Sequence, residues 1–189
     1  MKTVEIELTG TSPYLMHRFS DESSLEKKTR RIQVDNETPR ELATKVAYID
    51  TDGSYYFSAA SIPGTMSAAG ASHKMKSSRK TLKFVVPSAV RTESDKIFIL
   101  GEDGKPAANF EVDSRPVMIP ATRGRVMRHR PRFDAWKARF RLIINDDLLA
   151  PAMAHQLLNE AGVSVGVGDF RPAKGGPFGT FLVSKFAEV

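Results

Sequence analysis

The sequence contains no cysteine, and this absence excludes disulfide bonds, thiolate metal sites and cysteine nucleophiles. Only four histidines remain as nitrogen ligands, so neither a structural zinc site nor another metal or cofactor is expected. No run of 18 or more apolar residues is present, which excludes a membrane-spanning helix. The opening MKTVEIELTG has acidic residues where a signal peptide has its apolar stretch. We therefore expect a cytoplasmic protein that does not bind membranes.

The size and composition are those of an ordinary globular protein. The 189 residues are 41% hydrophobic and 26% charged. This length is typical of one domain, which we expect to span residues 1–189 with insertions at about 20–57 and 101–132.

Positive charge is concentrated in two segments. The net charge is +6, yet residues 115–141 hold nine lysines and arginines against the single acid Asp134, a local charge of +8. Residues 73–83 are also basic and contain no acid. Such clusters favour a polyanionic partner, although a solvated arginine-rich surface or an acidic protein partner would give the same composition. The expected nucleic-acid contacts are Lys74, Lys76, Arg79, Lys80, Arg123, Arg125, Arg128, His129, Arg130, Arg132, Arg139 and Arg141.

The hydrophobic periodicity predicts an α+β fold. Strands are expected at Thr3–Leu8, Phe84–Leu100 (interrupted), Ala135–Ile144 and Thr180–Phe186, and helices at Ile62–Ala71 and Leu148–Ala161. This βαββαβ order is that of the ferredoxin-like fold, an antiparallel sheet with helices on one face, as in RNA-recognition domains. On the strand at 135–144, apolar residues alternate with Lys137, Arg139 and Arg141, which predicts a basic row on one face.

Local signals add detail to this prediction. Thr38 and Glu41 have the spacing of a capping box and predict a short helix. Asp52-Gly53 predicts a hairpin turn. Ser61 is the expected cap of the first long helix, and Gly162 the expected end of the second.

A glycine-rich loop follows the last predicted helix. Residues 162–179 contain six glycines and fit neither a Walker nor a Rossmann motif, since no GK[ST] follows and the order is helix–loop–strand. Glycines let backbone amides approach phosphates, and Phe170 and Phe178 offer rings for base stacking. A tight loop without a ligand is the alternative. The expected contacts are Gly166, Gly168, Phe170, Arg171, Lys174, Gly175 and Gly176.

Two stretches resemble the RAMP superfamily, the CRISPR-associated ferredoxin-like proteins. FSAASIPGTM at 57–66 is similar to the strand–IPGSSLKG–helix signature of the backbone subunits, although the lysine is replaced, and the loop at 166–179 is similar to the family's glycine-rich loop. The resemblance implies binding of guide RNA or another single strand, an arginine-rich thumb or finger at 115–132, and head-to-tail assembly with copies of itself or with other RAMP-like subunits. The sequence also resembles small phage-encoded proteins.

The resemblance suggests possible catalytic residues as well. Processing nucleases of the family use a histidine with tyrosine support, which in this sequence would be His17 and Tyr14. Certain backbone subunits cut with an aspartate after the first strand, where Asp21 and Asp35 lie. We favour a non-enzymatic protein that binds single-stranded RNA, or single-stranded DNA. The alternatives are a metal-independent endoribonuclease centred on His17 and a structural protein with an acidic partner.

Overall fold

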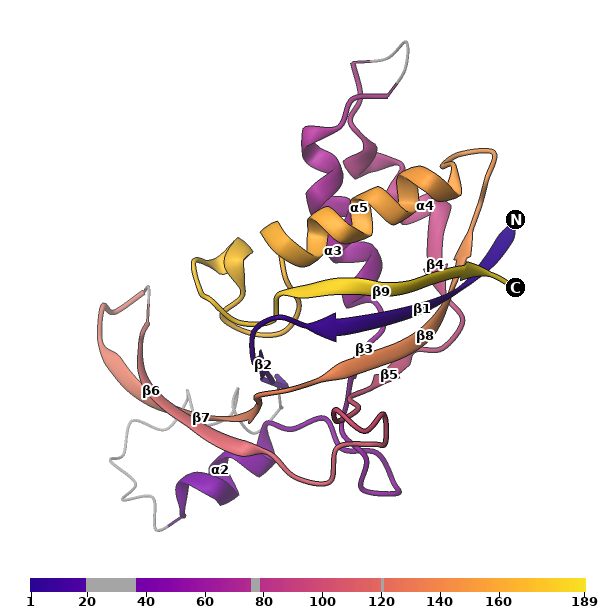
Figure 1. Cartoon of the computed structure of the whole chain (residues 1–189). Helices are drawn as coiled ribbons and strands as arrows, with labels where there is room; N and C mark the ends of the chain where they lie inside the picture. The colour runs from indigo at the N-terminus through magenta and orange to yellow at the C-terminus, as the bar shows by residue number, and fades with distance from the viewer. Residues whose placement is uncertain (20–36, 76–78, 120) are drawn as a thin grey trace.

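The computed structural model describes residues 1–19, 37–75, 79–119 and 121–189. Its centre is a four-stranded antiparallel sheet in the order β4-β8-β1-β9. The strands and the two main helices are β1 (Lys2–Gly10), β4 (Val90–Thr92), β8 (Lys137–Ile144), β9 (Phe181–Glu188), α3 (Ser61–Ala69) and α5 (Pro151–Ser164). Helices α3 and α5 contact each other and cover one face of the sheet (Figure 1).

The connections of this sheet are those of a ferredoxin-like fold. Helix α3 lies in the connection from β1 to β4, and β8 is inserted between these two strands in the sheet. Helix α5 lies in the connection from β8 to β9, and β1 is inserted between those two. Two split βαβ units therefore interlock, and the predicted α+β class and ferredoxin-like order are confirmed. The alternation that predicted β1 and β8 is also seen: Val4, Ile6 and Leu8 are fully buried, and Ile6 lies opposite Phe140.

The opposite face of the sheet carries the predicted basic residues of β8, two of them in ion pairs. Arg139 Nε donates to Glu7 Oε2 at 2.7 Å, and Arg141 lies 3.6 Å from Glu93. Lys185 of β9 pairs with Glu5 in the same way. The predicted alternation is therefore confirmed, since Lys137, Arg139 and Arg141 share the face opposite the core, but Glu7 and Glu93 pair with the two arginines.

A second sheet carries the arginine-rich segment. It consists of β2 (Tyr14–Leu15), β7 (Arg125–Phe133) and β6 (Glu111–Met118) in the order β2-β7-β6. Strands β6 and β7 form a long hairpin that projects from the four-stranded sheet (Figure 1). The sequence predicts only a short strand at Val117–Ile119 in this region, because both faces of the hairpin carry polar side chains and no apolar alternation marks it.

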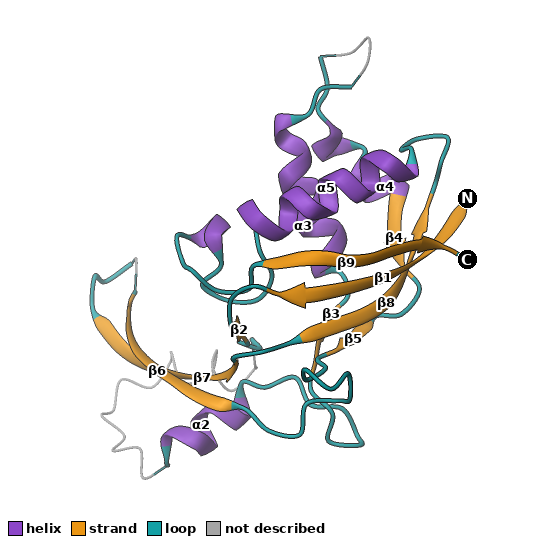
Figure 2. Ribbon diagram, viewed as in Figure 1, coloured by secondary structure: helices purple, strands orange, loops and turns teal. Residues whose placement is uncertain are grey.

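The remaining elements surround these two sheets (Figure 2). They are α2 (Pro39–Lys45), β3 (Tyr56–Ser58), α4 (Val86–Ala89), β5 (Lys96–Phe98) and the 3₁₀ turns η2 (Gly70–Ser72), η3 (Leu82–Phe84) and η4 (Pro172–Lys174). The capping box of α2 is confirmed, and so is the turn at Gly53, whose φ is 85°. The interrupted strand predicted at Phe84–Leu100 is wrong in its first part: residues 84 and 86–89 lie in η3 and α4, with Pro87 in the first turn, where a missing amide costs nothing, and within that range only β4 and β5 are strands.

Two predicted helix boundaries are also wrong. Helix α3 has Ala60, not Ser61, as its N-cap, and no side chain caps it. Gly162 does not end α5 but lies inside it, where a Cβ atom would be 2.2 Å from the carbonyl oxygen of Phe181. This glycine lets the helix approach β9. None of the helices in the described part of the chain is long and apolar enough to cross a membrane.

Candidate nucleic-acid interface

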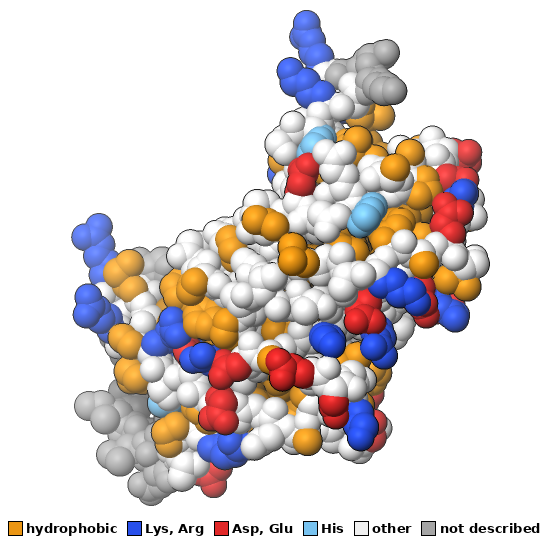
Figure 3. All heavy atoms as spheres, in the orientation of Figure 1, with side chains coloured by type: hydrophobic (Ala, Val, Ile, Leu, Met, Phe, Trp, Pro, Cys, Tyr) orange, Lys and Arg blue, Asp and Glu red, His pale blue; other side chains and the backbone are white. Residues whose placement is uncertain are grey.

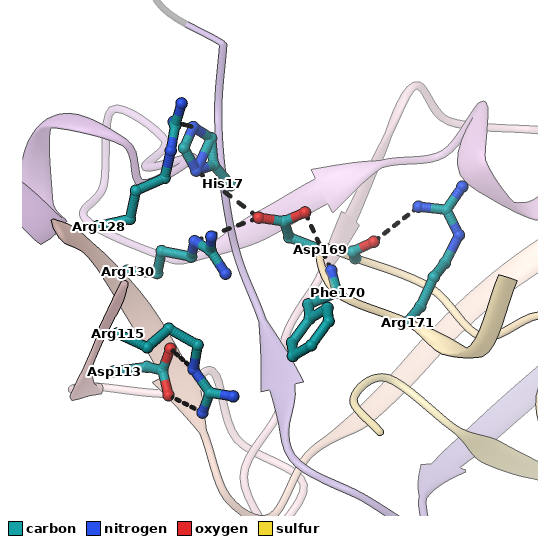
Figure 4. Close-up of polar contacts among 9 residues, drawn as sticks. His17, Asp113, Arg115, Arg128, Arg130, Asp169, Phe170 and Arg171 are labelled. Carbon is teal, nitrogen blue, oxygen red and sulfur yellow. Dashed lines mark hydrogen bonds and ion pairs between the residues drawn. The ribbon is translucent and has the colours of Figure 1, made fainter. Parts of the chain in front are cut away.

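One face of the β6–β7 hairpin points toward the glycine-rich loop and the segment after β2. The register places Asp113 opposite Arg130 and Arg115 opposite Arg128, so these four side chains share a face. Arg128 reaches His17, Arg130 reaches Asp169 and Arg115 lies over Phe170, while Asp113 pairs with Arg115 (Figure 4). The other face carries the exposed Met118 and Met127 and also His129, whose Nδ1 is 2.7 Å from Ser114 Oγ.

Asp169 contacts both a basic residue of the hairpin and the histidine after β2. Its Oδ2 lies 3.2 Å from Arg130 Nε and 3.7 Å from His17 Nδ1. Its own position is fixed, because its amide donates to Leu15 O at 2.8 Å and its Oδ1 accepts from the amide of Phe170 at 3.0 Å. The Arg130 side chain is 5% exposed and Asp169 is 39% exposed, so the carboxylate stands between a buried cation and solvent.

His17 is held as a neutral ring. Arg128 Nη1 lies 3.2 Å from His17 Nε2, and since a guanidinium can only donate, Nε2 accepts and the ring proton is on Nδ1, facing Asp169. Burial lowers the pKa of His17, Asp169 opposes this, and the charges of Arg130 and Arg128 lower it further.

We expect His17 to titrate below the ordinary value of 6.5 in an NMR pH titration. Asp169→Asn should lower this pKa further, because the carboxylate is the group that raises it, and Asp134→Asn should leave it unchanged. Since the folded chain resists protonation, the unfolded chain binds more protons just below pH 6.5. Stability from this site should therefore fall as the pH decreases from about 6.5 toward the folded pKa. A His17 pKa above the ordinary value would contradict the neutral ring.

The other possible catalytic residues are poorly placed for proton transfer. Tyr14 is 3% exposed, and burial raises its pKa, so its hydroxyl stays protonated at neutral pH. Asp21 and Asp35 lie outside the described residues. Within the described ranges no three histidine or carboxylate side chains gather as they would around a metal ion.

The glycine-rich loop uses its amides internally. From Gly166 to Gly179, every backbone N–H except those of Gly168 and Arg171 donates to an acceptor in the described part of the chain. A Cβ on Gly176 would lie 1.9 Å from Phe170 O, so this glycine allows the loop to cross itself. The expectation that bare amides along the loop face phosphates is therefore wrong for most of it. Gly166, Gly175 and Gly176 form the turn, and in this loop only the amides of Gly168 and Arg171 are without an acceptor among the described residues.

The two loop phenylalanines contact an arginine. The guanidinium of Arg115 lies 5.6 Å from the ring centre of Phe170 and 4.7 Å from that of Phe178. Phe178 is buried, so the expectation that it stacks on bases is wrong. Phe170 is half-buried and remains at the edge of a cavity.

Two cavities lie on either side of Arg171. The first, which we call the α3 pocket, has a volume of about 540 Å³ and lies between α3, Tyr14 and the loop. The second, the hairpin pocket, has a volume of about 570 Å³ and is lined by Arg115, Arg130 and Phe170. Both are bounded by Asp169, Arg171 and Lys174, so they form one continuous cationic surface.

The predicted cations are only partly brought together. Arg123 and Arg125 are exposed at the hairpin tip and have no ion-pair partner among the described residues, whereas Arg132 pairs with Asp134 at 2.5 Å. Lys74, Arg79 and Lys80 lie on a separate projection, and a largely uncharged surface separates the two basic regions in Figure 3. Lys76 lies outside the described residues.

Sequence reasoning missed Asp169 and the α3 pocket. Asp169 is the only acid in residues 162–179, a signal that could have marked it as a partner for the arginines. Ser61 and Gly64 stand out in the sequence as parts of a helix start and of the signature-like stretch at 57–66, but nothing local shows that they line a cavity.

Comparisons with known proteins support the fold. No family model and no curated protein matches this sequence. Among solved structures, the chain is similar to a chain in the cryo-EM structure of the Type III-B Cmr-beta bound to cognate target RNA, with a TM-score of 0.61 and 12% sequence identity. The match covers 100% of this chain and 60% of that chain, so the present chain spans less than two thirds of its neighbour's length.

Proposed function

We propose that this chain is a non-enzymatic, RAMP-like protein that binds single-stranded RNA along its arginine-bearing hairpin and the two cavities beside Arg171. The observation that carries the proposal is the position of the hairpin's arginine face, turned toward the cationic surface at Asp169, Arg171 and Lys174. The similarity to a chain of an RNA-bound complex supports the same interpretation. Assembly with further copies or other subunits belongs to this proposal.

The ion pairs decide which cations are available to phosphates. Arg115 and Arg132 each have a carboxylate partner on the same strand or just beyond it, and Arg130 has Asp169. The cations near the cavities and hairpin tip without a carboxylate partner among the described residues are Arg123, Arg125, Arg128, Arg171 and Lys174. Five phosphate contacts predict that log affinity falls with log salt with a slope of about −3.5. Because phosphate contacts carry no sequence information, sequence preference should be slight.

The test compares two pairs of arginines of equal charge. Arg123→Gln with Arg125→Gln should reduce the affinity for a labelled oligouridylate about tenfold at low salt, and flatten the salt slope by about 1.4. Arg139→Gln with Arg141→Gln removes the same charge from the ion-paired sheet face and should leave the slope unchanged. Fluorescence anisotropy at several salt concentrations measures both.

Three results would contradict the proposal: equal effects of the two pairs, a wild-type slope near zero, or tighter binding to single-stranded DNA than to RNA. Salt-insensitive binding to an acidic protein would instead favour the structural alternative. The geometry does not favour the endoribonuclease alternative, because Arg128 occupies the Nε2 lone pair of His17.

A further inference from the structure

The α3 pocket is lined by two different kinds of residue. They are the small residues of α3, Ser61, Gly64 and Ala68, and the aromatic residues Tyr14 and Tyr48. Arg171 and Lys174 lie at its boundary with the hairpin pocket. A flat ring with polar edges, attached to a phosphate, fits such a combination of aromatic wall, hydroxyls and cationic rim.

Gly64 has no structural role that the rest of the chain explains. It lies inside α3, where glycine is less favourable than alanine, and its backbone does not have a positive φ. A Cβ atom at Gly64 would meet nothing within 4 Å, in contrast to Gly162, whose Cβ would collide with Phe181. What the missing side chain does preserve is the space of the α3 pocket.

Several polar groups at the pocket lack a partner. Tyr14 is almost fully buried, and within the described residues its hydroxyl makes no hydrogen bond. Tyr14 lines the pocket together with Gly168, where a Cβ atom would lie 2.6 Å from Tyr14 Cε2. Among the described residues, Ser61 Oγ and Arg171 Nε are also buried without a hydrogen bond. Buried polar groups are normally satisfied, so these atoms are available to the polar groups of a ligand.

We propose that the α3 pocket binds one nucleobase of the RNA strand, with Tyr14 and Ser61 contacting its polar edge and Arg171 the adjoining phosphate. This inference rests on the proposed RNA-binding function. The strand then passes over Arg171, because this residue bounds both pockets, and the next nucleotide enters the hairpin pocket.

The test fills the pocket without weakening the fold. Gly64→Leu places a side chain in the empty space and replaces a poor helix residue by a good one, so thermal unfolding should occur at the same or a higher temperature. We expect RNA affinity to fall about tenfold, the usual effect of losing one stacked base. The salt slope should stay at the wild-type value, because no phosphate contact is removed. Gly64→Ala, which adds a single methyl group, is the matched control and should bind nearly as wild type.

An abasic ribose-phosphate polymer separates base binding from phosphate binding. The wild type should bind RNA more tightly than this polymer. In Gly64→Leu the ratio of the two affinities should be about tenfold smaller, and the affinity for the polymer should equal that of the wild type. Tyr14→Phe, which removes a hydroxyl with no internal partner among the described residues, should weaken RNA binding while stability is retained.

Wild-type RNA affinity in Gly64→Leu would overturn the base-binding inference and leave the RNA-binding proposal standing. Equal weakening of RNA and polymer by Gly64→Leu would overturn it too, because the leucine would then block phosphates. Absence of salt-dependent RNA binding by the wild type would overturn both.

Discussion

Gly179→Ala is expected to lower the free energy of unfolding by about 3–5 kcal/mol, a large effect for one added methyl group. Gly179 has a φ of 70°, which disfavours any L side chain, and a Cβ atom would lie 1.8 Å from Val167 O. The same residue joins two parts of the chain: its amide donates to Pro13 O, and its carbonyl accepts from the amide of Val167, each at 2.9 Å. Neither neighbour can move without breaking these bonds. Urea denaturation followed by circular dichroism measures the loss.

Gly175→Ala is the matched control. Gly175 has nearly the same φ, 74°, but nothing lies within 4 Å of its Cβ position. Only the backbone cost of about 1–2 kcal/mol should appear. Equal losses in the two variants would show that the close contact between position 179 and Val167 O adds nothing to the cost. The loop would then be able to move in spite of its hydrogen bonds.

Asp169→Asn is expected to lower the free energy of unfolding by about 2–3 kcal/mol. Arg130 is almost fully buried, and loss of its carboxylate leaves a desolvated guanidinium, a change that costs about 3–5 kcal/mol in fully buried pairs. The expected value is smaller because Asp169 is 39% exposed and because Asp113 still lies opposite Arg130. The change also removes one negative charge from the interface. RNA affinity at low salt should therefore stay the same or rise, while stability falls.

Asp134→Asn provides the comparison at a solvent-exposed pair. Asp134 is 56% exposed and its partner Arg132 is 37% exposed, so we expect a change of less than about 1 kcal/mol. Equal destabilisation by the two substitutions would show that burial of Arg130 adds nothing. Loss of RNA binding in Asp169→Asn, with the fold intact, would show that the carboxylate itself contacts the ligand.

Local patterns were sufficient to predict β1, β8 and β9 of the central sheet. Val4, Ile6 and Leu8 alternate with polar residues and are all buried, and the capping box at Thr38 forms as its spacing predicts. The β6–β7 hairpin was missed for a physical reason. It projects from the core, so burial does not impose an apolar alternation on it, and Pro116 within β6 argues locally against a strand.

The sequence predicted which segments form the candidate interface, but not which of their side chains are paired with each other. Composition found the arginines, but it could not show that Glu7 on β1 would neutralise Arg139 on β8, because that pair is brought together by strand pairing across the length of the chain. Likewise, glycine density correctly marked a constrained loop, while most of its amides proved to donate to carbonyl groups of the chain itself. Long-range pairing, not local pattern, decides which charges remain free.

The position of β1 between β8 and β9 has a consequence for folding during synthesis. Both partners of this strand follow residue 136, so β1 leaves the ribosome long before either can pair with it. At usual rates of translation the delay between Gly10 and Lys137 is roughly 6–25 s. Throughout this interval Val4, Ile6 and Leu8 have no sheet to cover them, and a nascent chain in this state is a substrate for chaperones. High contact order of this kind also predicts slow refolding from denaturant, on the millisecond-to-second scale of sheet-rich domains.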